Sequence, residues 1–222
     1  MNNKIMKKIL LVFGAIAILG GSISVPVQAD PPVQIAENQE GQTAQFKPGL
    51  LKLEDLPSGF QELPPNLSAQ LSQQLLTISS QFRQGGIDPQ EFFIFYHPRS
   101  LEVVFGFTGA IADVPYFDAS LQLLKESPDL QQSIMEQIQE ALKDVSIAEL
   151  TELQVVPTEE MGDNSIGVKA GMKVLGMSFQ GDLISFRRND TGGFAAVMYR
   201  PSRSPQISAN ALAGKIDGKI TN

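Results

Sequence analysis

A group of arginines near the C-terminus has the clearest potential for chemistry. Within seventeen residues the chain carries Arg187, Arg188, Arg200 and Arg203. If the strands that carry them pair, the guanidinium groups meet at one end of a sheet and suit a carboxylate, a phosphate headgroup or an acidic partner. Charged side chains also protect sheet edges from pairing with other chains, and this structural interpretation stays open. Our partner-binding candidates here are Arg187, Arg188 and Arg200.

A second candidate is a group of aromatic residues between positions 92 and 107. These side chains could line a cavity for an apolar ligand, with Phe93 and Phe95 as the binding candidates. They could also be ordinary core, because strands buried on both faces are continuous apolar runs. The group comprises Phe92, Phe93, Phe95, Tyr96, Phe105 and Phe107.

Catalytic chemistry has little support in the sequence. The single histidine, His97, precedes Pro98 in a predicted turn, and a catalytic role would need a serine or carboxylate partner that the sequence does not identify. We interpret it as a turn residue with its ring in water. Ser178 lies in GMSFQG, which lacks the spacing of a nucleophile elbow. We therefore predict no catalytic residue, no cofactor and no enzymatic activity, and a hydrolase is the least favoured hypothesis.

Metal binding is likewise weakly indicated. EEMGDNS brings together Glu159, Glu160, Asp163 and Asn164, whose oxygens are ligands that Ca²⁺ prefers, but the ligand order of a calcium loop is missing. A solvated turn is the favoured interpretation, and we predict no metal site. The chain has no cysteine, which excludes disulfides, thiol chemistry and zinc–thiolate sites.

The first 29 residues have the pattern of an export signal. Three lysines precede an uncharged apolar run from Ile9 to Gly21, and Val27-Gln28-Ala29 resembles a signal-peptidase site. The run has 13 residues, whereas a membrane-spanning helix needs about 20. We expect cleavage after Ala29 and export to a periplasmic, extracellular or lumenal compartment. The alternative is a segment retained as an N-terminal anchor.

Net charge limits the kinds of partner. The whole chain has a formal charge of −7, and without the three signal lysines 14 basic and 24 acidic residues leave −10. Such an acidic chain is a poor candidate for nucleic acid or for anionic lipid surfaces. Peripheral membrane association stays an open alternative.

The hydrophobic pattern predicts the elements that position these residues. Residues 30–49 are polar and aperiodic, which indicates an arm, and 50–222 form a single domain. Apolar positions at helical spacing predict helices at 66–86, at about 114–127 and at about 127–145, with Ser208 capping another at the C-terminus. Residues 92–107 predict a hairpin whose turn is HPRS.

From Glu149 onward the apolar period changes to two. Even positions are apolar from Ile166 to Val174, which predicts a half-buried antiparallel strand or a hairpin turning at Gly171. Near Gly181-Asp182 the apolar residues change from odd to even positions, which suggests a β-bulge. Helices and strands thus come in separate blocks, and the predicted class is α+β, an antiparallel sheet flanked by helices.

The segment EDLPSGF predicts a fixed turn. Pro57 restricts φ, Gly59 permits positive φ, and Leu56 and Phe60 should pack inward on either side. LLKLEDLPSGF also resembles the opening of exported bacterial domains, namely mycobacterial-type lipoprotein and kinase sensor domains and related cyanobacterial proteins of unknown function. EEMGDNSIGV, DLISFRRNDTGGFAAVMY and ISANALAGKIDGKI resemble later segments of the same domains.

The resemblance implies a Mog1/PsbP-like sandwich. It also implies a role in sensing, in carriage of a hydrophobic ligand or in accessory binding, and it carries over no catalytic residue. We therefore expect a non-enzymatic exported domain that acts on a protein partner at the outer face of a membrane. The alternative is a carrier or sensor of a lipid or other apolar ligand.

Overall fold

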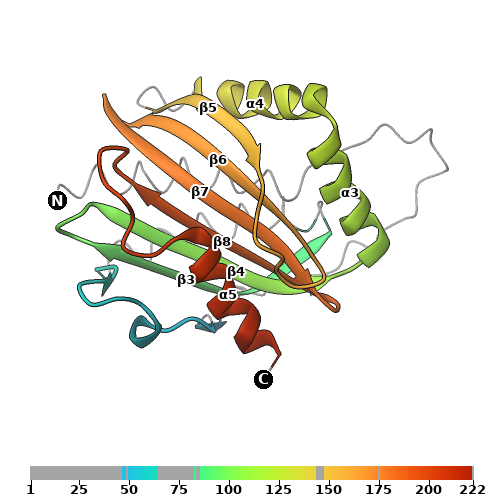
Figure 1. The fold of residues 1–222 in the computed structure, drawn as a ribbon, viewed down its shortest axis with the longest axis horizontal. Helices are drawn as coiled ribbons and strands as arrows, with labels where there is room; N and C mark the ends of the chain where they lie inside the picture. Colours follow the sequence, from blue (N-terminus) through green and yellow to red (C-terminus); the bar gives the residue numbers. More distant parts are fainter. Residues whose placement is uncertain are drawn as a thin grey trace, which may run out of the picture.

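The computed structural model describes residues 47–48, 50–64, 83, 86–143, 148–174 and 176–221. Within this part, the chain forms one sheet with three helices (Figure 1). The predicted signal peptide, nearly all of the predicted arm and nearly all of the predicted helix at 66–86 lie outside the described residues. No helix among the described residues is long and apolar enough to cross a membrane.

The sheet is antiparallel except at its first strand. Across the described part the strand order is β1-β3-β4-β8-β7-β6-β5, β2 pairs beside β3, and the two-residue β1 alone runs parallel to its neighbour. This arrangement confirms the predicted α+β class. In chain order the elements are β1 (Lys47–Pro48), the 3-10 turn η2 (Leu53–Asp55), β2 (Gln61–Glu62), β3 (Ile87–His97), β4 (Glu102–Ile111), α3 (Val114–Glu126), α4 (Pro128–Lys143), β5 (Ala148–Val156), β6 (Asn164–Val174), β7 (Met177–Arg188), β8 (Thr191–Tyr199) and α5 (Ala209–Ile220).

Helices α3 and α4 begin at local capping signals. The Asp113 side chain accepts a hydrogen bond from the Tyr116 N–H at 2.9 Å, and the Ser127 hydroxyl accepts one from the Leu130 N–H at 3.3 Å. The predicted helix at about 114–127 is confirmed as α3, and its apolar residues Phe117, Leu121 and Leu124 are buried. These side chains and Ile134 of α4 pack against one face of the sheet.

Helix α5 closes the opposite face. As predicted, Ser208 caps it, accepting from the Ala211 N–H at 3.1 Å, and Leu212, Ala213 and Ile216 are fully buried. Figure 1 shows α5 crossing β8 near the C-terminus of the chain. The segment 50–63 packs into the same core through Leu51, Leu56 and Phe60.

Strand β7 is buried on both faces, and this explains why its apolar residues change from odd to even positions. As predicted, the even residues of β6 from Ile166 to Val174 are buried, and the strand continues through Gly171 without a turn. The predicted bulge near Gly181 is wrong, because β7 pairs in continuous register with both neighbours. Leu183 faces the core under α3, whereas Ile184 faces the core under α5. Neighbouring residues of β7 therefore enter different cores.

The turn before Phe60 is confirmed, and it contacts the lone histidine. Gly59 has φ +102°, Phe60 is 5% exposed, and the rings of Phe60 and His97 meet edge to face with centroids 5.4 Å apart. The His97 ring is half-buried against this turn, so the prediction of a ring in water is wrong. The contact was not evident from the sequence because 37 residues separate the two rings.

We expect Gly59→Ala to destabilise the protein by about 1–2 kcal/mol, because its φ is unfavourable for a residue with a Cβ. That Cβ would also lie 2.3 Å from His97 Nε2. Urea unfolding of Gly59→Ala in the wild-type and His97→Ala backgrounds measures the two effects separately. The loss should shrink in the His97→Ala background, and an equal loss in both would exclude the clash.

Candidate functional site

The four arginines of the C-terminal region do not meet. Arg188 lies opposite Thr191 beside the β7–β8 turn, whereas Arg200 follows the far end of β8, where Tyr199 lies opposite Gln180. The prediction of one basic patch is therefore wrong, because consecutive antiparallel strands carry the two pairs to opposite ends of the sheet. Each end has its own chemistry.

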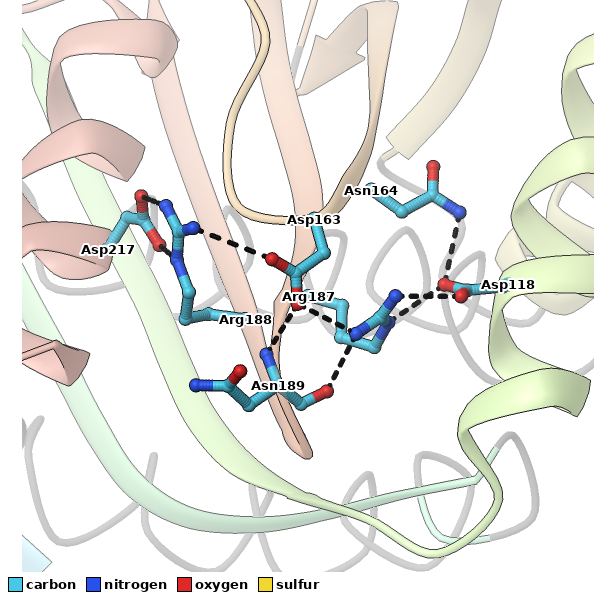
Figure 2. Close-up of polar contacts among 7 residues, drawn as sticks. All are labelled: Asp118, Asp163, Asn164, Arg187, Arg188, Asn189 and Asp217. Carbon is cyan, nitrogen blue, oxygen red and sulfur yellow. Dashed lines mark hydrogen bonds and ion pairs between the residues drawn. The ribbon is translucent and has the colours of Figure 1, made fainter.

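At the first end Arg187 is enclosed by acceptors (Figure 2). Its Nε and Nη2 donate to the two oxygens of Asp118 at 2.9 and 2.8 Å. Its Nη1 donates to Asp163 Oδ2 at 2.9 Å and to the Asn189 carbonyl at 2.8 Å. The bidentate fork joins α3 to the end of β7, and the third contact holds the β5–β6 loop.

Arg188 makes the matching contact to the other helix. Its Nε donates to Asp217 Oδ1 of α5 at 2.8 Å, and its Nη1 lies 3.5 Å from Asp163 Oδ1. The Asn189 N–H donates to Asp163 Oδ2 at 2.7 Å. Figure 2 shows these side chains as one connected set, which we call the aspartate–arginine network: Asp118, Asp163, Asn164, Arg187, Arg188, Asn189 and Asp217.

The network holds α3, α5 and the β5–β6 loop to the end of β7, and it is poorly suited to binding an anion. Three carboxylates face two guanidinium groups, and the Arg187 side chain is 13% exposed. An incoming carboxylate or phosphate would have to displace an aspartate that already has near-ideal geometry. Binding through Arg187 and Arg188 remains a prediction, and their contacts support a structural role.

Acid should weaken this network. The hydrogen bonds from Arg187 hold the pKa of the Asp118 carboxyl below its usual range. A lowered pKa in the folded state means that the carboxylate stabilises the protein above its unfolded pKa of about 4 and loses this contribution as pH falls through the folded value.

We therefore expect Asp118→Asn to be less stable than wild type at pH 7, with a smaller difference at pH 3. Urea midpoints at the two pH values test this. The exposed neighbour Asp190→Asn is the control, and it should show no such convergence. A constant difference for Asp118→Asn would show that the ion pair is not the source of its stability.

The second end of the sheet carries arginines of a different kind. The Arg203 N–H donates to the Arg200 carbonyl at 2.9 Å, and Arg203 Nη1 donates to the Arg99 carbonyl at 3.3 Å. The first contact closes the loop after β8, and the second joins that loop to the β3–β4 turn. We call Arg99, Arg200 and Arg203 the arginine end.

Unlike the network, the arginine end has no carboxylate partner within the part of the chain that the structure describes. No ion pair among the described residues includes Arg99, Arg200 or Arg203. The Arg200 guanidinium instead lies 5.7 Å from the centre of the Phe179 ring, which fixes its position without neutralising it.

A buried carboxylate supports the loop beneath these arginines. Glu102, at the start of β4, is 1% exposed, and its oxygens accept the Gln206 N–H at 2.8 and 3.1 Å and the Ile207 N–H at 3.4 Å. Burial raises the pKa of Glu102, against the opposing effect of these hydrogen bonds. Through these hydrogen bonds Glu102 orders the loop that follows β8.

The structure gives His97 a serine partner, but not a catalytic one. Ser100 Oγ lies 2.8 Å from Nδ1, and the Ser100 backbone N–H donates to the same nitrogen at 3.1 Å. Both contacts close the local turn. On the other side of the ring, Gly59 lies against Nε2. The nearby Glu102 carboxylate is occupied by backbone N–H groups. This geometry caps a turn and lacks the relay that a nucleophilic serine requires.

The aromatic candidates are part of the core. Phe93 and Phe95 are 7% and 6% exposed and pack with Phe60 and Val104 beneath α5. Phe105 and Phe107 face the opposite core. Because the β3 pair and the β4 pair enter different cores, these four aromatics do not line one shared cavity.

The acidic segment before β6 is divided between two roles. Asp163 and Asn164 belong to the network, and Glu159 and Glu160 are exposed. Among the described residues no group of three or more His, Cys, Asp or Glu side chains could hold a metal ion. An open hollow of about 770 Å³ lies beside the segment, lined by charged and apolar side chains that include Lys125, Val155, Glu160 and Met161.

Sequence reasoning missed the partners of the arginines. Asp118 and Asp217 lie 69 and 29 residues from the arginine that each contacts. Asp163 carried a usable signal, because a β6–β7 hairpin turning near residue 175 places Asn164 opposite Arg187. A scan against protein-family models finds no match to this chain, and a search of curated proteins finds no similar sequence.

Proposed function

We propose that this protein is a non-enzymatic exported domain that binds a protein partner at the outer face of a membrane. The N-terminal signal pattern supports export, and removal of 29 residues would expose Asp30 as the new N-terminus. We further propose that its α+β sheet belongs to the Mog1/PsbP-like sandwiches. Helices on both faces of the sheet and the packed Phe60 turn support this relationship.

The observation that carries the function is the tight packing between α3 and the sheet among the described residues. An apolar pocket between α3 and the sheet measures about 20 Å³ and is lined by Leu121, Leu124 and Phe194 among others. That is room for about one water molecule, whereas small-molecule sites occupy about 300–1,000 Å³. Within the described part of the chain, recognition is therefore assigned to the surface.

A carrier or sensor of an apolar ligand is the second candidate. The open hollow beside the β5–β6 loop is large enough for a small molecule. Its lining includes Lys125, Glu160 and Asn164, which suits a polar ligand better than a lipid tail. The aromatic pair Phe93 and Phe95, on which the carrier hypothesis depended, is packed against other core residues.

Native mass spectrometry of the protein taken from its own exported fraction distinguishes these functions. A complex with a second protein, and a mature chain that begins at Asp30, are the expected results. An added mass of a few hundred daltons that is lost on denaturation would favour the carrier. A bare monomer, even after chemical crosslinking in intact cells, would count against the accessory role.

A further inference from the structure

The arginine end is a concentration of positive charge on an acidic protein. The turn His97–Leu101 and the loop Arg200–Ser208 contain three arginines and no acidic residue. The whole chain has a formal charge of −7. At physiological ionic strength charges interact over about 8 Å, so an approaching group would experience this local surface rather than the net charge.

The two loops that carry the guanidinium groups are held in place before any partner arrives. Glu102 holds the loop through the Gln206 and Ile207 N–H groups, and the Arg203 contact to the Arg99 carbonyl joins the two loops. Pro98, Pro201 and Pro205 further restrict the backbone. A preorganised surface loses less conformational entropy on binding, which favours affinity.

From these observations we propose that the arginine end is a docking surface for an acidic segment of a protein partner. Planar guanidinium groups bind carboxylates through paired hydrogen bonds, and here all three cations are arginines. This inference rests on the proposed function, because it assumes that the partner is a protein, and it adds the chemistry of the contact.

The surface fits an acidic protein segment better than a membrane. The exposed large apolar residues of the described chain are Leu53, Tyr116 and Leu123, and none lies on the two loops. Peripheral binding to a bilayer usually combines basic residues with an apolar side chain that inserts. The two loops lack such an anchor.

The test compares charge reversal at this surface with charge reversal elsewhere. Arg99→Glu with Arg203→Glu changes two exposed side chains and leaves Arg200 on Phe179. Lys52→Glu with Lys169→Glu is the control, because it changes the net charge equally at exposed positions outside the two loops. Circular dichroism and urea unfolding first establish that both variants are folded.

Binding is measured by calorimetry on the mature chain at low and high salt. The probes are a synthetic ten-residue Asp/Glu-rich peptide, a Lys-rich peptide, and vesicles of phosphatidylglycerol in phosphatidylcholine. We expect the acidic peptide to bind, the arginine variant to bind it at least tenfold more weakly, and the control to stay within about twofold. Absence of peptide binding, or an equal loss in the control, would overturn the proposal. So would vesicle binding that depends on the same arginines.

Photo-crosslinking in cells separates this proposal from the proposed function. A crosslinker at Ser202 or Ser204, between the arginines, should capture a protein, and Arg99→Glu with Arg203→Glu should abolish the capture. Capture from Thr151 or Glu160 but not from these serines would leave the accessory function standing and refute the docking surface. Capture from no position would refute both.

Discussion

Arg187→Ala should lower the free energy of unfolding by about 2–4 kcal/mol, the largest loss that we expect from any charged residue described above. Breaking a fully buried ion pair costs about 3–5 kcal/mol, because the abandoned charge keeps its desolvation penalty. Here the Arg187 side chain is 13% exposed and its partners Asp118 and Asp163 are 33% and 36% exposed, so water recovers part of that cost.

Urea unfolding at pH 7 measures the Arg187→Ala effect, with Arg203→Ala as the matched control. Arg203 has no ion-pair partner among the described residues, so its variant should unfold at the wild-type urea concentration. Hydrogen exchange adds a local measurement. In Arg187→Ala, the protection of backbone amides from exchange should fall more in α3, which Asp118 anchors, than in β4. Equal stability of the two variants would mean that the network contributes nothing to the fold.

Glu102→Ala should cost about 2–3 kcal/mol, because two backbone N–H groups lose their acceptor beneath the loop. Glu102→Gln should cost less at neutral pH, since its amide oxygen still accepts while no charge is buried. Comparison of the two variants by thermal unfolding distinguishes the role of the acceptor from the role of the charge. Similar losses in both would show that the charge itself is required.

The pH dependence of Glu102→Gln has a defined sign. Burial raises the pKa of Glu102, so the stability linked to its protonated form is fully present below the unfolded pKa of about 4.3. That contribution is lost as pH rises through the folded pKa. The stability of Glu102→Gln relative to wild type should therefore increase between pH 4 and pH 7. A decrease over that range would contradict the assignment.

The elements of the fold were predictable because their signals are local. The period of two in β6, the Ser208 cap and the apolar face of α3 each occupy fewer than fifteen consecutive residues. The parity change of β7 was read as a bulge, because the helix that buries its even residues lies more than twenty residues further along the chain. A strand buried on both faces cannot be recognised without knowing what covers it.

The candidate site was less predictable, because charge neutralisation depends on sheet order. The sequence groups four arginines, and the structure neutralises Arg187 and Arg188, whereas Arg200 and Arg203 have no carboxylate partner among the residues that it describes. Arg99 joins the second group only because β4 lies next to β8. Sequence alone does not state that adjacency.

The core beneath α5 has a consequence for the order in which the chain folds. This core contains residues from the two ends of the described chain: Leu51, Leu56, Phe60, Leu212 and Ile216. The same two segments are joined by an ion pair, in which Lys219 Nζ lies 2.7 Å from Asp55 Oδ2. A chain that is still being synthesised cannot complete this core until Leu212 and Ile216 have left the ribosome. Under the export that we propose, such late closure would keep the precursor unfolded while it passes through a translocation channel.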